Sequence, residues 1–155
     1  MTRPSWDQTW MKVADVIAQR SRCDGRMIGA VIVDTTNRIV STGYNGAPHG
    51  YEVNEGCKAW CPRMRGNHRT LDYSNCLSVH AEANAIAFAD RRNYEGGSLY
   101  VTSACCWDCG KLVANSGIYR VVMRMWNADR HRDPERTIGF LEECGLEVTV
   151  LRMGK

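Results

Sequence analysis

Two short motifs carry residues whose types and spacing suit a zinc ion. His80-Ala81-Glu82 precedes a run of helix formers, and Cys106 and Cys109 stand three residues apart at the start of a second expected helix. One imidazole and two thiolates can hold zinc and leave its fourth position for water, as in catalytic sites. A carboxylate beside that water can take its proton without binding the metal. The motifs therefore predict a hydrolytic zinc site with His80, Cys106 and Cys109 as ligands and Glu82 as the acid–base group.

The spacing of His80 and Glu82 sets a condition on the helix that follows. Residues two apart in a regular helix point roughly 200° away from each other. Both side chains can serve one site only if the helix directs its first turn at the metal. A helix start also carries unpaired N–H groups and the positive end of the dipole, which favours the thiolate forms of Cys106 and Cys109.

Alternating helices and strands are expected to position these residues. Ser5 to Gln8 has the form of a capping box, and apolar residues then recur at helical spacing. The patterns predict helices over 6–19, 78–90, 107–116 and 134–144, and strands over 28–33, 38–43, 99–102, 119–125 and 147–151. The order α-β-β-α-β-α-β-α-β predicts an α/β fold with helices on both faces of a mixed sheet, its later strands parallel.

The stretch 44–77 is the exception, because it holds several glycines and two prolines and shows no sustained period. A loop of this length in a compact domain is functional, disordered or held in place by another group. Three cysteines fall within it.

Composition narrows the class of protein. A chain of 155 residues with 44% hydrophobic content predicts one domain, over 1–155, with a real core. The sequence shows no apolar run of signal-peptide or bilayer-spanning length, which predicts a cytoplasmic protein without a membrane partner. The net charge of +3 gives little reason to expect a nucleic-acid partner. Eight cysteines in a reducing compartment favour metal binding, whereas a secreted protein could use them in disulfide bonds.

Four runs of sequence resemble the deoxycytidylate (dCMP) deaminase family, over about 23–118. They are IGAVIV at 28–33, STGYNGAP at 41–48, VHAEANAI at 79–86, and LYVT at 99–102 leading to C-x-x-C-x-K at 106–111. H-x-E and C-x-x-C are shared by zinc deaminases of several nucleobases, and STGYNG narrows the resemblance to this family. The resemblance implies a three-layer α-β-α cytidine-deaminase-like fold with a mixed five-stranded sheet.

The same resemblance implies an activity and contacts for its substrate. It implies zinc-dependent hydrolysis of dCMP to dUMP and ammonia, supplying dUMP for thymidylate synthesis. Activated water would attack C4 of cytosine, and Glu82 would carry protons to N3 and to the leaving amine. Asn45 would contact the sugar or base, backbone groups near Ala81 would hold the base, and Asn84 would add a polar contact. Trp126 would stack on the nucleotide, although an ordinary, partly buried aromatic residue is the alternative.

Regulation and assembly are further implications of the resemblance. Phe88 and Arg91 match an aromatic residue and an arginine that lie near subunit contacts and bound nucleotide in the family. Members are commonly hexameric, and many respond to dCTP as activator and dTTP as inhibitor. We therefore expect dCMP as the small-molecule partner, dCTP and dTTP as effectors that Mg²⁺ would accompany, and a homo-oligomer without nucleic acid.

The remaining cysteines suggest a second metal. In several microbial and phage-type members, cysteines or histidines in these regions bind a structural zinc ion, which would also explain order in the long loop. The resemblance implies four ligands, with His49 and His68 as reserves: Cys23, Cys57, Cys61 and Cys76. The alternative is that one or two are small buried side chains, as we expect of Cys144.

Cys105 is a departure from the family pattern. The family usually has proline directly before the first zinc cysteine, where the ring fixes φ at the corner between strand and helix. We predict that Cys105 takes the place of that proline and does not bind the metal.

Two other functions stay open. A deaminase of another cytosine nucleotide or nucleoside (CMP, 5-substituted dCMP, cytidine) or of another nucleobase would share the zinc machinery. A zinc-stabilised nucleotide-binding module would keep the metal and leave Glu82 idle. A basic cluster would suit a tRNA deaminase, but a solvated helix face is the commoner explanation and the small net charge supports it: Arg120, Arg124, Arg130, Arg132 and Arg136.

Overall fold

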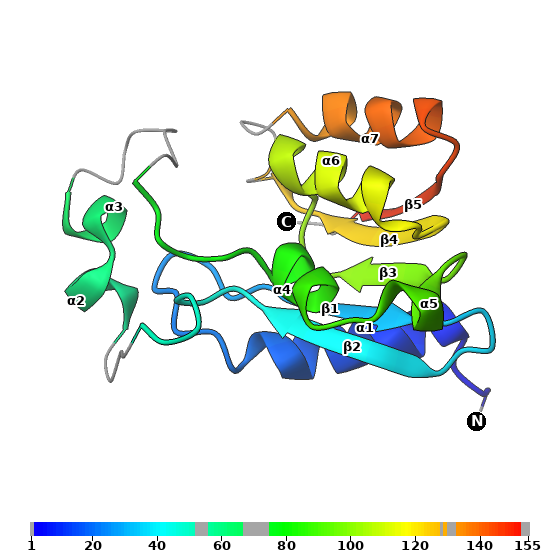
Figure 1. Cartoon of the computed structure of the whole chain (residues 1–155), viewed down its shortest axis with the longest axis horizontal. Coiled ribbons are helices and arrows are strands. Elements are labelled where there is room, and N and C mark those ends of the chain that lie inside the picture. The colour runs from blue at the N-terminus through cyan, green and yellow to red at the C-terminus, as the bar shows by residue number, and fades with distance from the viewer. Residues whose placement is uncertain (1, 52–55, 67–74, 128, 130–132, 153–155) are drawn as a thin grey trace.

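The computed structural model describes residues 2–51, 56–66, 75–127, 129 and 133–152 (Figure 1). Its helices are α1 (Trp6–Ala18), α2 (Cys57–Trp60), α3 (Pro62–Arg65), α4 (Ala81–Ala87), α5 (Arg91–Tyr94), α6 (Trp107–Ser116) and α7 (Pro134–Glu143). Its strands are β1 (Gly29–Val33), β2 (Ile39–Tyr44), β3 (Ser98–Val101), β4 (Arg120–Met125) and β5 (Glu147–Arg152).

The strands form one five-stranded sheet in the order β2-β1-β3-β4-β5. β1 is antiparallel to both of its neighbours, whereas β3, β4 and β5 run parallel. Right-handed crossovers through α6 and α7 are the expected way to join parallel strands, and both helices lie on the same side of the sheet in Figure 1. The predicted mixed sheet and its parallel half are confirmed.

Alternation along β1 divides the core into two layers. Ala30 and Ile32 belong to the apolar cluster that includes side chains of α4, α6 and α7. Val31 and Val33 point to the other face, where they pack with Met11 of α1. Successive side chains of a strand face opposite sides, so a strand that is buried along its whole length needs a helix on each face.

A glycine in β2 lets α4 lie directly against the sheet. A Cβ atom on Gly43 would come within 2.2 Å of the backbone oxygen of Ala81 and 2.5 Å of the backbone nitrogen of Ala85. No side chain fits in this space, since real Cβ contacts do not fall below 3.0 Å. Gly43 therefore sets how closely the N-terminal turn of α4 approaches β2.

The ends of the elements follow the predicted signals in most places. Ser5 and Gln8 form both halves of the capping box, Pro134 lies in the first turn of α7, and Gly145 after that helix has a positive φ of 87°. The helix expected over 78–90 is shorter at both ends: Val79 pairs with Gly46 in an isolated β-bridge and remains extended, and the helix ends at Ala87. The stretch 44–77, for which no element was predicted, contains the short helices α2 and α3.

Two of the clustered arginines tie β4 to α1. Arg120 donates to Asp7 at 2.7 and 2.9 Å, and Arg124 donates to Asp15 at 2.8 Å. Arg136 lies over the ring of Trp107, with its guanidinium carbon 3.9 Å from the ring centroid. Arg130 and Arg132 are outside the described residues.

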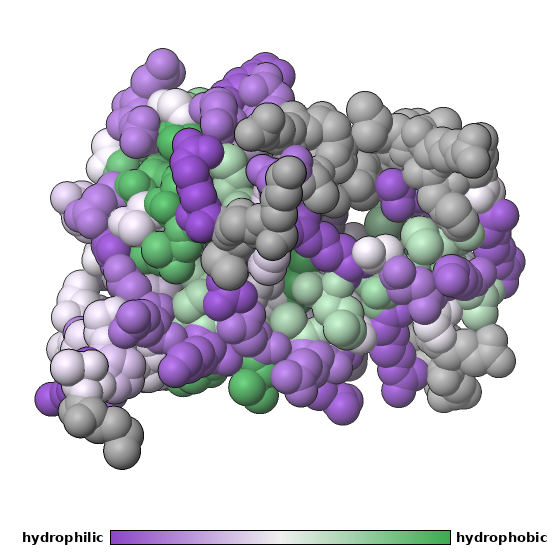
Figure 2. All heavy atoms as spheres, turned by 180° about the vertical axis from the view of Figure 1, so that it is seen from behind, coloured by the Kyte–Doolittle hydropathy of each residue, from purple (hydrophilic) through white to green (hydrophobic). Residues whose placement is uncertain are grey.

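Figure 2 shows the molecule from behind the view of Figure 1, and on this face hydrophilic side chains lie between groups of apolar ones. Among the described residues, every helix is too short or too polar to cross a bilayer.

Candidate metal centre and its cavity

Three of the predicted ligands converge on one point. The Nδ1 atom of His80 lies 3.4 Å from Sγ of Cys106 and 3.3 Å from Sγ of Cys109. With zinc–nitrogen and zinc–sulfur bonds of about 2.0 and 2.3 Å, neighbouring ligands of a tetrahedron stand about 3.5 Å apart. Within the described part of the chain this is the one group of three or more such donors that lie within 4.8 Å of one another. Its donor set and spacing fit zinc.

The starts of two helices bring these donors together. His80 is the N-cap residue of α4 and has an extended backbone, with ψ at 155°. Glu82 lies in the first turn of the same helix. The 200° separation of a regular helix therefore does not apply, and both side chains can face one site. Cys106 is the N-cap of α6, where its sulfur accepts the backbone N–H of Cys109 at 3.5 Å.

Burial and hydrogen bonds set the protonation of the site. The Cys109 thiol donates to Cys106 and, with His80 nearby, lowers the pKa of the Cys106 thiol to about 4. A depressed thiol pKa favours the thiolate that binds metal. Burial raises the pKa of Glu82 above its ordinary value of 4.5, although His80 opposes this shift. A carboxyl group with a raised pKa holds a proton more readily and can return it to a substrate.

Cys105 contacts Glu82 and is outside the group of three donors. Its side chain is 1% exposed. Burial and the neighbouring carboxylate raise the pKa of the Cys105 thiol well above its ordinary value, so the thiol stays protonated and donates to Glu82.

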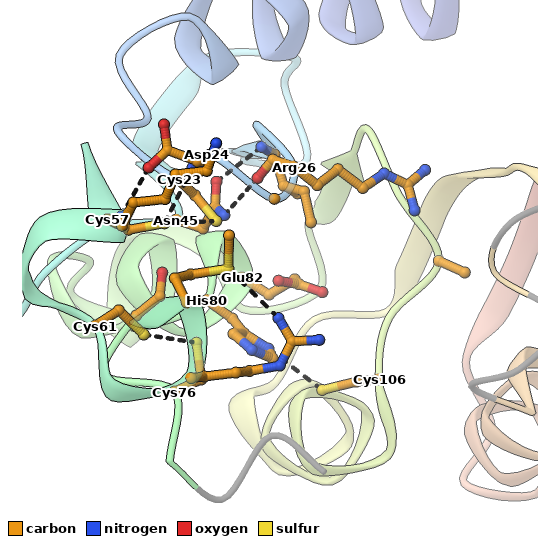
Figure 3. Close-up of a pocket in the computed structure, with 17 residues that line it drawn as sticks. Cys23, Asp24, Arg26, Asn45, Cys57, Cys61, Cys76, His80, Glu82 and Cys106 are labelled. Carbon is orange, nitrogen blue, oxygen red and sulfur yellow. Dashed lines mark hydrogen bonds between the residues drawn. The ribbon is translucent and has the colours of Figure 1, made fainter. Parts of the chain in front are cut away.

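The donors open into a cavity of about 480 Å³, a volume typical of small-molecule sites. His80, Glu82 and Cys106 line it, together with Asn45 from the end of β2 (Figure 3). The Oγ atom of Ser78 is buried at the wall and has no hydrogen-bond partner among the described residues. A polar ligand atom could satisfy that hydroxyl group.

Four other cysteines line the same cavity as two pairs (Figure 3). The Sγ atoms of Cys23 and Cys57 are 3.8 Å apart, and those of Cys61 and Cys76 are 4.0 Å apart. Two thiolates on one tetrahedral zinc ion stand about 3.8 Å apart. Each pair has this spacing, but within the described residues the four sulfurs do not all lie within 4.8 Å. None of the eight cysteines, all of which are described, forms a disulfide bond.

Backbone N–H groups point at these sulfurs. The N–H of Asp24 donates to Sγ of Cys57 at 3.0 Å. Burial acts to raise the pKa of the Cys61 thiol, but backbone N–H groups that include those of Leu77 and Met64 outweigh it, and the pKa falls. Donors of this kind stabilise thiolates and orient metal ligands.

Of three residues expected to contact the substrate, Asn45 lines the cavity, whereas Asn84 and Ala81 do not. Asn45 is buried, and its amide accepts the N–H of Ile28 and donates to the carbonyl of Arg26, both at 2.8 Å. Asn84 donates to the carbonyl of Tyr44 at 2.7 Å and is not among the residues that line the cavity. Ala81 is fully buried and also lies outside the lining.

The other expected residues lie further from the donors. Trp126 donates from its ring nitrogen to the carbonyl of Thr102 at 3.1 Å and lines a separate pocket. Phe88, at the C-cap of α4, is 72% exposed, and Arg91 pairs with Glu95 at 2.9 Å. His49 is exposed and outside the cavity lining, and His68 is outside the described residues.

Sequence reasoning missed the positive charges of the cavity. Arg26, Lys58 and Arg63 line it beside the cysteines and Glu82. A usable signal was present, because Arg26 is three residues before the first residue of β1 and Arg63 is two residues after a candidate metal ligand.

Comparison with known proteins gives concordant matches. The model of the cytidine and deoxycytidylate deaminase zinc-binding region matches residues 4–125. The deoxycytidylate deaminase of Mycobacterium phage D29 is 44% identical over 128 residues, which cover 79% of this chain and 96% of the relative. The deoxycytidylate deaminase of Saccharomyces cerevisiae is 35% identical over 150 residues, which cover 96% of this chain but 45% of that longer relative.

A solved structure agrees over nearly the whole chain. The crystal structure of dCMP deaminase from the cyanophage S-TIM5 in complex with dCMP and dUMP matches with a TM-score of 0.71 and 27% sequence identity. The match covers 97% of this chain and 100% of that chain.

Proposed function

Because the chain belongs to the family of cytidine and deoxycytidylate deaminases, we propose that it hydrolyses dCMP to dUMP and ammonia. The observation that carries this proposal is the convergence of His80, Cys106 and Cys109 beside the buried carboxyl group of Glu82. The relatives from phage D29 and yeast bear the name deoxycytidylate deaminase, and the cyanophage enzyme was solved with dCMP and dUMP.

His80, Cys106 and Cys109 would hold one zinc ion. When bound, the zinc lowers the pKa of a water molecule at its open position toward neutrality. Glu82 would take one proton from the attacking water and deliver it to N3 of the cytosine ring as the water oxygen bonds to C4. It would then carry the remaining proton of that oxygen to the amine on C4, so that the C4–N bond breaks, ammonia leaves and the oxygen stays double-bonded to C4. The raised pKa of Glu82 supports its role as the proton carrier, because the carboxyl group must hold a proton between the two transfers.

The four remaining cavity cysteines would hold a second, structural zinc ion. The support is the spacing within the pairs Cys23–Cys57 and Cys61–Cys76, together with the backbone N–H groups that face their sulfurs. Closing the two pairs around one ion requires them to move together. Such an ion would fix α2 and α3 against the cavity.

Assembly and regulation are proposed from the resemblance to the family. The chain would act as one domain in a cytoplasmic homo-oligomer, with a hexamer favoured. The exposed ring of Phe88, three residues before Arg91 in the chain, supports a subunit contact at the end of α4. dCTP and dTTP, accompanied by Mg²⁺, would regulate the enzyme through this region. Asn45 would contact the substrate from the cavity wall, whereas Ala81, Asn84 and Trp126, which lie outside that lining, would contribute from behind it.

A substrate panel tests the proposed reaction. Ammonia release is measured with dCMP, CMP, deoxycytidine, cytidine and 5-methyl-dCMP under equal conditions. The proposal expects dCMP or its 5-substituted form to give the highest kcat/KM. Equal rates with phosphorylated and unphosphorylated substrates would favour a nucleoside deaminase, and release from none of them would favour a zinc-stabilised nucleotide-binding module.

A further inference from the structure

The cavity has a charged wall that the metal centre does not explain. Arg26, Lys58 and Arg63 line it, and the acidic residues of the lining are Asp24 and Glu82. Zinc ligands and a proton carrier account for the end where the cytosine ring would react. A nucleotide also brings a phosphate dianion, for which arginine is well suited because its planar N–H groups match phosphate oxygens.

The side chain of Asn45 holds the backbone around Arg26. The amide of Asn45 donates to the carbonyl of Arg26 and accepts the N–H of Ile28, so one side chain holds the backbone on both sides of Met27. β1 begins at Gly29, directly after this segment. In Figure 3, Arg26 extends away from Cys61 and Cys76, along the other side of the cavity. Lys58, by contrast, is exposed on the short helix α2.

A buried carboxylate fixes the guanidinium group itself. Nη1 of Arg26 donates to Asp129, which is 0% exposed. Asp129 also accepts the backbone N–H of Trp126 at 2.9 Å, and the guanidinium carbon of Arg26 lies 5.9 Å from the centroid of the Trp126 ring. The Arg26 side chain remains 27% exposed. An arginine has five N–H donors, so a bond to Asp129 leaves others for a ligand in the cavity.

We propose that Arg26 binds the 5′-phosphate of the nucleotide substrate and that Asp129 is the positioning residue that holds its guanidinium group toward the cavity. The inference rests on the proposed deaminase function and assigns its preference for a phosphorylated substrate to a named side chain. In this arrangement the ring of Trp126 lies beside the guanidinium group of Arg26 and would help to keep it next to the phosphate.

The test compares dCMP with deoxycytidine, which differ in the phosphate alone. The readout is the ratio of kcat/KM for dCMP to kcat/KM for deoxycytidine, measured for the wild type and for R26Q, R26K and D129N. Loss of a charge-assisted contact lowers such a ratio about 10- to 100-fold, which is the result expected for R26Q. R26K and D129N should lower the ratio less, mainly through KM for dCMP. Inorganic phosphate should inhibit the wild type more strongly than R26Q.

R124Q is the matched control, because Arg124 is also a half-buried, ion-paired arginine but does not line the cavity. Its ratio should equal that of the wild type. An R26Q ratio equal to that of the wild type would overturn the proposal and leave Arg26 as a structural ion pair. A loss of ratio in R63Q but not in R26Q would overturn it in favour of α3. If the wild type deaminates deoxycytidine as well as dCMP, phosphate recognition fails although deamination stands, whereas absence of activity on both would instead remove the proposed function.

Discussion

The Cys105 thiol donates a hydrogen bond to the carboxyl group of Glu82. The two residues belong to different elements, since Cys105 lies between β3 and α6 and Glu82 lies in the first turn of α4. The deaminase family usually has a rigid proline at this position. This chain has a cysteine there, and its thiol contacts Glu82, the proposed proton carrier. The departure therefore changes a contact to the reacting group and leaves the three metal donors in place.

Replacing Cys105 should separate this contact from metal binding. In C105A the chain should retain the catalytic zinc, because the donor group consists of His80, Cys106 and Cys109. The value of kcat should fall about fivefold, since a hydrogen bond of this kind contributes about 1 kcal/mol. Zinc is measured by atomic emission and kcat by ammonia release. Loss of one zinc ion from C105A would show that Cys105 is a ligand.

Gly43 should be the most sensitive glycine near the site. In G43A the new Cβ atom would meet the backbone of α4 at Ala81 and Ala85, so the helix must move away from β2. Overpacking of this kind costs about 1–3 kcal/mol of unfolding free energy, and the movement should also weaken zinc binding through His80. Urea unfolding and zinc content are the measurements.

Gly139 in α7 provides the control, because a Cβ atom there would meet nothing within 4 Å. G139A should stabilise the chain by about 0.5–1 kcal/mol, since alanine favours a helix over glycine. Equal stability of G43A and G139A would contradict the close approach of α4 to β2.

The ion pair between α1 and β4 should make stability depend on pH. The Arg120 guanidinium, which donates to Asp7, lowers the pKa of Asp7 below its ordinary value of 3.8. A carboxylate with a depressed folded-state pKa stabilises the fold above its unfolded-state pKa and loses that effect as the pH falls through the folded-state value. D7N should therefore be less stable than the wild type at pH 7, and the difference should shrink below about pH 4. An equal difference at pH 7 and pH 3 in urea unfolding would argue against it.

Metal content should report the second site directly. Purified wild type should contain about two zinc ions per chain, and C57S about one, since its other cavity cysteines would hold an incomplete set. Cys144, which we expected to be buried, is exposed and does not line the cavity, because it lies at the solvent-facing C-cap of α7. C144S is therefore the control, and it should keep both ions. A wild-type value near one would remove the structural zinc and leave the two cysteine pairs as thiols.

Local sequence patterns predicted most of the fold. The helix expected over 107–116 has those bounds in the structure, and the cap of α1 follows its motif, because both depend on residues close in the chain. The metal donors could be predicted for a similar reason, since each motif begins a helix and a single strand separates them. The helix over 78–90 was predicted too long, because helix propensity gives no sign of the pairing between Val79 and Gly46.

Contacts between distant segments could not be predicted in this way. Arg26 and Asp129 are 103 positions apart, and neither belongs to a repeating pattern. Their pairing requires the loop after β4 to return beside the start of β1, which is a property of the folded sheet. The contact between Cys105 and Glu82 was missed for the same reason, although the absence of proline at position 105 had marked the residue as unusual.

Glu82 provides the most direct test of the account as a whole. E82Q keeps the size of the side chain and removes its ability to carry a proton. With dCMP as substrate, the rate of ammonia release should fall about 10²- to 10⁴-fold, while the zinc content stays equal to that of the wild type. Ammonia release by E82Q at the wild-type rate would contradict the assignment of Glu82 and with it the proposed chemistry of this cavity.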